Sequence, residues 1–292
     1  MIKFLDLQKI NLQYKEEIKS KLIDVFTSGW YLQGEENKLF EKKLSAYLNV
    51  PFVIGVANGL DALRLILKAY MALGVMKEGD EIIVPANTYI ASILAITDNR
   101  LVPVFIEPAI YNCNLDSTKI EEKITPKTKA IVPVHLYGQA ANMEAIMKIA
   151  AVHNLAVIED NAQAIGCEVR FSDGAVKKTG SIGTIGTTSF FPSKNLGGYG
   201  DGGAIMTNND ELAAKIKMIA NHGQSKRYYH DMVGCNSRLD TIQAAVLEVK
   251  LKYLDEYIAA RQKVAAYYNQ AFADNPHITV PFRAGLSANA WL

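Results

Sequence analysis

The sequence predicts an α/β protein in which a mostly parallel sheet, covered by helices on both faces, forms one large domain. Short apolar runs of strand length recur between residues 52 and 206, and each run is continuous instead of alternating with polar residues. Amphipathic helical patterns separate these runs. The chain has 292 residues, which is enough for such a sheet and part of a second domain. Together these observations indicate strands that are buried on both faces, as in parallel sheets.

Composition excludes several other classes of protein. Apolar residues make up 49% of the chain and charged residues 21%, which is typical of globular proteins and not of disordered ones. The net charge is +1, so no overall field attracts nucleic acid or an anionic membrane. The three cysteines, Cys113, Cys167 and Cys235, have neither metal-ligand nor disulfide spacing. Without a membrane span or a signal-peptide pattern, we expect a soluble cytoplasmic protein that binds no metal.

The order of the predicted elements supports the parallel sheet. Two helices come first, one ending at Ser28-Gly29 and the other before Pro51, and strands and helices alternate from there. The predicted strands are 52–56, 81–84, 101–106, 130–134, 155–158, 187–191 and 204–206. The predicted helices among and after them are 61–71, 88–97, 117–124, 143–153 and 211–220.

The pattern changes after residue 220. A polar loop, 221–227, precedes a helical stretch from Thr241 to about Phe272 that contains no helix breaker. Residues 278–280 then have the composition of a strand, but the chain stops with nothing to pair it. We therefore expect a large domain over residues 1–245 and an incomplete small C-terminal domain over residues 246–292, either cut short or completed by another chain.

The most informative stretch surrounds Lys194. This lysine follows a predicted strand, and glycine occupies five of the seven positions from 197 to 203. Glycine allows sharp bends and close approach of a ligand to the backbone. A lysine held between a strand end and such a loop is desolvated, which lowers its pKa and frees its amine for imine chemistry. The alternative is a surface lysine beside a flexible turn.

Four further groups lie at strand ends, where ligands bind in open α/β sheets. The turn that contains Gly59 and Leu60 begins a helix, so its N–H groups suit a phosphate, although a plain capped turn is the alternative. Asp160 follows an apolar strand and is either a cleft acid or a helix cap. Ser189 is placed to reach a phosphate oxygen, or is simply buried in its strand. Tyr89 offers an aromatic plane for a flat ring, or packs in the core.

In combination, these groups match the requirements of a single cofactor. A phosphate cradle, a carboxylate, an aromatic plane and a reactive lysine are the groups that pyridoxal phosphate requires. The lysine forms a Schiff base with the cofactor, the carboxylate keeps the pyridine nitrogen protonated, and the helix start holds the phosphate. The sequence therefore predicts a pyridoxal-phosphate site.

Longer motifs strengthen this prediction. They are Asn58-Gly59-Leu60-Asp61-Ala62-Leu63, Glu159-Asp160-Asn161-Ala162-Gln163-Ala164, the stretch 189–203, and the stretch 234–245 that begins Gly234-Cys235-Asn236-Ser237-Arg238. On these residues the chain resembles the DegT/DnrJ/EryC1/StrS family of pyridoxal-phosphate-dependent sugar aminotransferases. The resemblance implies the type I, aspartate-aminotransferase-like fold of pyridoxal-phosphate transferases.

The resemblance also implies roles for individual residues. Lys194 and Asp160 are the catalytic residues it implies, as the Schiff-base lysine and the partner of the pyridine nitrogen. The cofactor-binding residues it implies are Gly59, Leu60, Tyr89, Asp160, Gln163, Ser189, Lys194 and Asn236. Among these, Gln163 is expected near the cofactor hydroxyl, and Asn236 at the phosphate of the partner subunit's cofactor. A homodimer with shared active sites is therefore expected.

The implied activity is transfer of an amino group from an amino acid, with glutamate as the expected donor, to a keto sugar bound to a nucleotide. Family members with histidine in place of the lysine carry out dehydration, so Lys194 favours transamination. The Asn-Gly-Leu-Asp-Ala-Leu turn resembles that of members acting on dTDP-3-keto-6-deoxyhexoses, in the biosynthesis of amino sugars for surface polysaccharides or antibiotics. The alternative is a cofactor-binding but non-catalytic regulatory or assembly protein, because the family's small domain continues beyond the elements present here.

The roles of three other residues are left open by the sequence. His135 matches the family and is interpreted as structural more readily than as catalytic. Arg227 and Arg238 are candidates for binding the donor carboxylate or the nucleotide diphosphate, with surface or interface ion pairs as the alternative.

Overall fold

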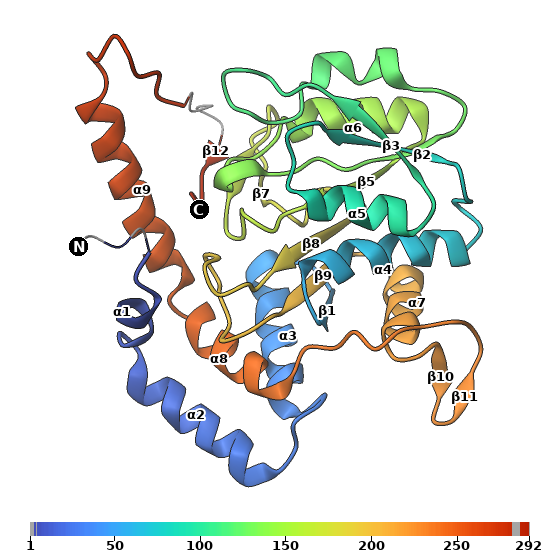
Figure 1. Cartoon of the computed structure of the whole chain (residues 1–292), viewed down its shortest axis with the longest axis vertical. Coiled ribbons are helices and arrows are strands. Elements are labelled where there is room, and N and C mark those ends of the chain that lie inside the picture. The colour runs from blue at the N-terminus through green and yellow to red at the C-terminus, as the bar shows by residue number, and fades with distance from the viewer. Residues whose placement is uncertain (1–2, 4, 282–286, 292) are drawn as a thin grey trace.

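The computed structural model describes residues 3, 5–281 and 287–291. Within this part of the chain a seven-stranded sheet lies between two layers of helices (Figure 1), in the order β1-β9-β8-β5-β4-β2-β3. Its strands are β1 (Phe52–Val56), β2 (Glu81–Pro85), β3 (Val102–Ile106), β4 (Thr128–Ile131), β5 (Ala156–Asp160), β8 (Ile185–Ser189) and β9 (Gly203–Thr207). Strands β8, β5, β4, β2 and β3 are parallel to one another, whereas β9 is antiparallel to both of its neighbours, β1 and β8. The predicted mostly parallel sheet is confirmed.

Helices cover both faces of the sheet. The helices are α1 (Leu7–Asn11), α2 (Lys15–Ser28), α3 (Glu35–Leu48), α4 (Gly59–Ala72), α5 (Ile90–Asp98), α6 (Met143–His153), α7 (Asp210–Ala220), α8 (Thr241–Leu251) and α9 (Leu254–Ala271). In β2, Ile83 belongs to a buried apolar cluster that includes residues of α3, α6 and α8, while Ile82 and Val84 belong to a second cluster that includes residues of α4, α5 and α7. A strand with apolar neighbours on both sides has no polar face, which explains the continuous apolar runs in the sequence.

Two local expectations are corrected by the structure. The predicted helix 117–124 is two short 3₁₀ turns, Ser117–Lys119 and Glu121–Lys123, because the segment buries only Ile120 and lies between an Asp116 turn and Pro126. The predicted polar loop 221–227 belongs partly to a hairpin of β10 (Gln224–Lys226) and β11 (Tyr229–His230).

A hairpin of β6 (Glu168–Arg170) and β7 (Val176–Lys178) was not among the predicted elements. The Asp173-Gly174 pair between these strands is a common hairpin turn and could have indicated it.

The C-terminal region also differs from the prediction. The single helix expected from Thr241 to Phe272 is divided into α8 and α9 at Tyr253, whose φ of −109° and ψ of 7° are not helical. Its ring stacks on Tyr14 at a centroid distance of 3.6 Å, and its hydroxyl bonds to Glu17. Because these contacts come from the N-terminal segment, no local breaker marks the break.

The strand predicted at residues 278–280 is wrong, since the described backbone there is irregular. Instead, β12 (Ser287–Ala288) pairs antiparallel with β6, so residues 287–291 lie against the large domain. The expected domain boundary, between residues 245 and 246, falls within α8, and this division of the chain remains a prediction.

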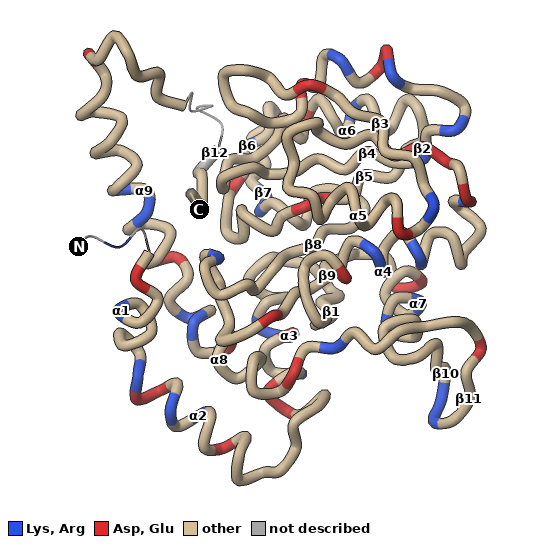
Figure 2. The backbone as a smooth tube through the Cα atoms, in the orientation of Figure 1, with Lys and Arg blue, Asp and Glu red and all other residues tan. Residues whose placement is uncertain are grey.

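Charge is distributed evenly, as the net charge of +1 suggests. Lysine and arginine alternate with aspartate and glutamate over most elements (Figure 2). None of the helices in the described part of the chain combines the length and the hydropathy needed to cross a bilayer.

Candidate active site

A cavity of about 440 Å³ lies at the carboxyl ends of the parallel strands. Residues from five segments line it, including seven of the eight residues expected at the cofactor site. These seven are Gly59, Leu60, Tyr89, Asp160, Gln163, Ser189 and Lys194. The eighth, Asn236, is exposed outside this cavity and forms a β-bridge with Asn221. The structure therefore brings together the groups that the sequence placed at separate strand ends.

Asp160 is the last residue of β5 and is only 6% exposed. Its backbone N–H donates to the Pro133 carbonyl at 2.9 Å, and its carbonyl accepts from the His135 N–H at 3.1 Å. The carboxylate accepts from the Ser92 hydroxyl at 2.7 Å and from the Ala162 N–H at 3.2 Å. These bonds fix a carboxylate in the wall of the cavity.

Lys194 enters the cavity from the turn that follows β8. Its backbone N–H donates to the Phe191 carbonyl at 2.9 Å, which closes this turn around Pro192. Burial lowers the pKa of the Lys194 amine, and the negative charge of Asp160 opposes that effect without reversing it. The site therefore contains a partly desolvated amine that loses its proton more readily than a surface lysine.

The start of α4 forms the third side of the cavity. The Asn58 side chain caps the helix by accepting from the Asp61 N–H at 2.8 Å, which leaves the N–H groups of Gly59 and Leu60 without intrahelical acceptors. A Cβ atom at Gly59 would lie 2.8 Å from the Ser189 Cβ, so the helix start and the end of β8 are in close contact. Together they form a suitable cradle for an anion.

We expect Gly203→Ala to disrupt this cradle. A Cβ at Gly203 would lie 2.5 Å from the backbone carbon of Asn58 and 2.8 Å from the Gly59 nitrogen, so the start of α4 must shift. The expected loss is about 2 kcal/mol of unfolding free energy, with weaker binding of inorganic phosphate. Urea unfolding and a phosphate titration measure both effects.

Gly200→Ala is the matched control for this substitution. A Cβ at Gly200 would meet only the end of the Gln243 side chain, which can move. Equal destabilisation by the two substitutions would contradict the assignment of the cradle.

Tyr89 and Gln163 complete the wall of the cavity. Tyr89 precedes the first residue of α5 and is 70% exposed, which excludes the alternative of core packing. Gln163 Oε1 accepts from the Tyr137 N–H at 2.6 Å, and Tyr137 has a positive φ of 56°. This bond fixes the orientation of the Gln163 amide and uses its oxygen, so the amide N–H groups remain available as donors.

A second buried lysine supports the glycine-rich loop. Lys250 on α8 donates to the Gly197 carbonyl at 2.7 Å and to Asn11 Oδ1 at 3.0 Å, and its amine lies 4.7 Å from the centre of the Tyr199 ring. Burial lowers the pKa of Lys250 to about 8. No sequence pattern marks this residue, because its partners come from distant segments and it resembles any lysine on a helix.

The low pKa of Lys250 predicts a pH-dependent stability. Between pH 8 and 10.5 the unfolded chain holds more protons at this residue than the folded chain, so unfolding free energy rises with pH. A shift of this size corresponds to a gain of about 3 kcal/mol across that range. In Lys250→Met the gain should be absent, and urea unfolding at pH 7.5, 9 and 10.5 measures the difference between the two proteins. Parallel pH curves for both proteins would refute the assignment.

His135 and Glu159 form a buried pair below the cavity. His135 Nδ1 accepts from the Ala141 N–H at 3.1 Å, so its Nε2 carries the proton and donates to Glu159 at 2.8 Å. Glu159 also accepts from three backbone N–H groups of residues 180, 182 and 183. Neither residue lines the cavity. This geometry fits the structural interpretation of His135.

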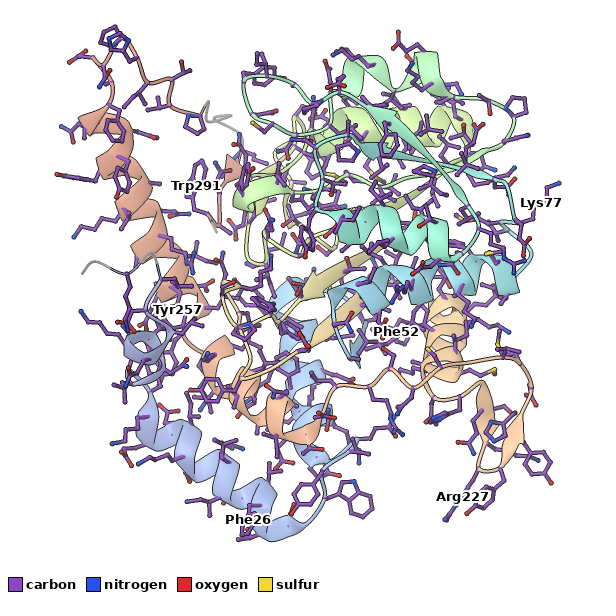
Figure 3. The ribbon with its side chains drawn as sticks, viewed as in Figure 1. Phe26, Phe52, Lys77, Arg227, Tyr257 and Trp291 are labelled. Carbon is purple, nitrogen blue, oxygen red and sulfur yellow. The ribbon has the colours of Figure 1, made fainter. Side chains whose placement is uncertain are left out.

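The two arginines also lie away from the cavity. Arg227 projects from the β10–β11 hairpin, away from the body of the domain (Figure 3). Arg238 donates to Asn221 Oδ1 at 3.4 Å. In the described residues no three His, Cys, Asp or Glu side chains are grouped as metal ligands.

The sheet order and the cavity, with a lysine and a carboxylate in its wall, define a transferase of the pyridoxal-phosphate type I fold. The chain belongs to the DegT/DnrJ/EryC1/StrS aminotransferase family, whose model matches residues 12–292. The resemblance inferred from the sequence motifs is thereby confirmed.

Individual relatives agree with this assignment. The chain is 50% identical over 291 residues to the dTDP-3-amino-3,6-dideoxy-alpha-D-galactopyranose transaminase of Aneurinibacillus thermoaerophilus, an alignment that covers 100% of this chain and 77% of the relative. The structure of this chain is similar to that of S. venezuelae DesV in complex with a ketimine intermediate, with a TM-score of 0.94 and 40% identity. The alignment covers 99% of this chain and 76% of DesV. The structure is also similar to that of Bacillus subtilis NtdA with bound cofactor PMP, with a TM-score of 0.88 and 34% identity; the alignment covers 99% of this chain and 65% of NtdA.

Proposed function

We propose that this protein transfers an amino group from an amino acid, with L-glutamate as the donor, to the 3-keto group of a dTDP-linked 6-deoxyhexose. The observation that carries the proposal is the presence of Lys194 and Asp160 in the wall of one cavity that also contains a helix N-terminus. The name of the Aneurinibacillus relative, a transaminase of a dTDP-linked 3-amino sugar, supports the choice of substrate. Such an enzyme serves amino-sugar biosynthesis and works in the cytoplasm.

The residues of the cavity fit pyridoxal 5'-phosphate. Gly59 and Ser189 lie in close contact at the start of α4, where the N–H groups of Gly59 and Leu60 have no intrahelical acceptor and suit a phosphate. The carboxylate of Asp160 suits a protonated ring nitrogen, Tyr89 offers a plane for stacking, and Gln163 offers a donor for the ring hydroxyl. When bound, the cofactor supplies an electron sink for a carbanion.

The protein's own residues supply positioning and proton transfer. Because burial lowers its pKa, the Lys194 amine loses its proton more readily than a surface lysine, so it can act as a nucleophile and then carry a proton between donor and acceptor carbons. Asp160 stays in place through its hydrogen bonds to Ser92 and Ala162 and provides the negative charge opposite the ring nitrogen.

Asn236 is proposed to act in the partner subunit. It is exposed and lies outside its own chain's cavity, on the stretch between the β10–β11 hairpin and α8. In a homodimer with shared active sites, its side chain would reach the cofactor phosphate of the second copy. This proposal accounts for the position of Asn236, which does not line the cavity of its own subunit.

The test of the proposed function is a half-reaction. Purified protein loaded with pyridoxal phosphate is mixed with L-glutamate, and loss of the visible absorbance of the cofactor is followed together with formation of 2-oxoglutarate. The amino form should then convert a dTDP-3-keto-6-deoxyhexose to the 3-amino sugar. Bound cofactor without any glutamate turnover would favour the non-catalytic regulatory or assembly protein.

A further inference from the structure

Ser92 lies directly behind the wall of the cavity. It belongs to the first turn of α5 and is 1% exposed, whereas its neighbours Tyr89, Ile90 and Ala91 line the cavity. A serine within a helix commonly faces solvent or bonds to its own helix. The Ser92 hydroxyl instead donates to Asp160 Oδ2 at 2.7 Å, across 68 positions of sequence.

Thr88 extends this contact into a chain of hydroxyl groups. Its Oγ1 lies 2.8 Å from the Ser92 Oγ. Each hydroxyl has one proton, and Ser92 uses its own on the carboxylate, so Thr88 must be the donor to Ser92. Both hydroxyls thus direct their protons toward Asp160, and the last bond is assisted by the negative charge of the carboxylate.

The other hydrogen bonds of Asp160 do not by themselves fix the orientation of its carboxylate. Hydrogen bonds to Pro133 and His135 fix the backbone, but they do not determine how the carboxylate is turned. The Ala162 N–H, in the segment that follows β5, donates to Asp160 Oδ1 at 3.2 Å. Among the hydrogen bonds of the described residues, Ser92 is the side chain that restrains Oδ2.

We propose that Ser92 is a positioning residue that orients the Asp160 carboxylate toward the ring nitrogen of bound pyridoxal phosphate, an inference that rests on the proposed function. The same turn of α5 carries Tyr89 into the wall of the cavity, and the Ser92 N–H donates to the Tyr89 carbonyl at 3.1 Å. One turn of helix therefore sets both the aromatic plane and the direction of the carboxylate.

The experiment measures cofactor affinity instead of turnover. Each variant of the 292-residue chain is freed of cofactor and titrated with pyridoxal phosphate, with visible absorbance as the signal. Ser92→Ala should raise the dissociation constant about tenfold, the effect of losing one hydrogen bond to a charged group. Ser92→Thr, which keeps the hydroxyl, should restore affinity to within about threefold of the natural protein.

Two controls separate positioning from folding. Thr97→Ala removes a hydroxyl from the exposed end of the same helix, where it bonds only to the Ile93 and Leu94 carbonyls, and should leave affinity unchanged. Ser92→Cys keeps the side-chain volume but is a weak donor, so it should resemble Ser92→Ala in affinity without opening a cavity.

A double substitution tests whether Ser92 acts through Asp160. In an Asp160→Ala background, Ser92→Ala should change affinity by less than about twofold, because the carboxylate it orients is gone. An equal loss of affinity in both backgrounds would overturn the proposal, as would unchanged affinity in the folded Ser92→Ala and Ser92→Cys proteins. If the natural chain itself bound no pyridoxal phosphate, the proposed function would fail and this inference with it.

Discussion

Lys194→Ala is expected to lower turnover by about 10⁴-fold, because the lysine serves both as nucleophile and as proton carrier. The variant should also lose the ability to be labelled when the loaded protein is reduced with borohydride, since no other amine occupies the same position in the cavity wall among the described residues. Mass spectrometry of peptides locates the reduced cofactor on the natural chain, and it should be found on Lys194.

The loss of turnover in Lys194→Ala should not result from unfolding. Because the folded state lowers the pKa of this lysine, its protonated form is destabilised by burial at neutral pH. The cofactor-free variant should therefore unfold at a urea concentration at least as high as the natural protein does.

Lys178→Ala provides the control for removal of a lysine. Lys178 lines a different cavity, beside β6 and β7, and forms an ion pair with Glu168 at 3.1 Å. Its turnover and borohydride labelling should match those of the natural chain. Labelling of the Lys194→Ala protein at the natural level would refute the assignment of Lys194 as the nucleophile.

The sequence was sufficient to predict that the candidate site residues lie close together, because parallel strands place their carboxyl ends at one edge of a sheet. Lys194, Asp160 and Ser189 all follow or end neighbouring strands, β5 and β8, which are paired in register. The helix start at Gly59 joins them because β9 brings Gly203 against Asn58. Knowledge of strand order was not needed to place these groups on the same side of the sheet.

The sequence could not reveal the residues that support the site. Ser92, Glu159 and Lys250 all lie within regular elements and have the local pattern of ordinary helix or strand residues. Their importance comes from partners far away in the chain, at separations of 68, 24 and 53 positions for their contacts with Asp160, His135 and Gly197. Such contacts are set by tertiary packing and leave no periodic signal.

The C-terminal region shows the same limitation. The break between α8 and α9 depends on Tyr14, which stacks on Tyr253 from the opposite end of the sequence. The pairing of β12 with β6 depends on a hairpin that was not predicted from the sequence. Asn236 remains a prediction for a further reason, since the contact expected of it is in a second subunit.

The adjacent carboxylates Asp160 and Glu159 should respond in opposite ways to loss of their charge. We expect Asp160→Asn to lower turnover by about 10³-fold, because the negative charge opposite the ring nitrogen disappears. Its stability should change by less than about 1 kcal/mol, since the amide oxygen can still accept from Ser92 or Ala162. Turnover at saturating substrate and urea unfolding of the cofactor-free protein measure the two quantities.

Glu159→Gln should mainly destabilise the fold. One carboxylate oxygen accepts from His135 and the Gly180 N–H, and the other accepts from the N–H groups of Ile182 and Gly183. Whichever way the amide of glutamine is turned, its NH₂ group faces two donors, so two buried donors lose their acceptor. The expected cost is about 3 kcal/mol of unfolding free energy, and the fraction that remains folded should still bind pyridoxal phosphate. If Asp160→Asn instead proved to be the less stable variant and retained its turnover, the roles assigned to these two neighbours would have to be exchanged.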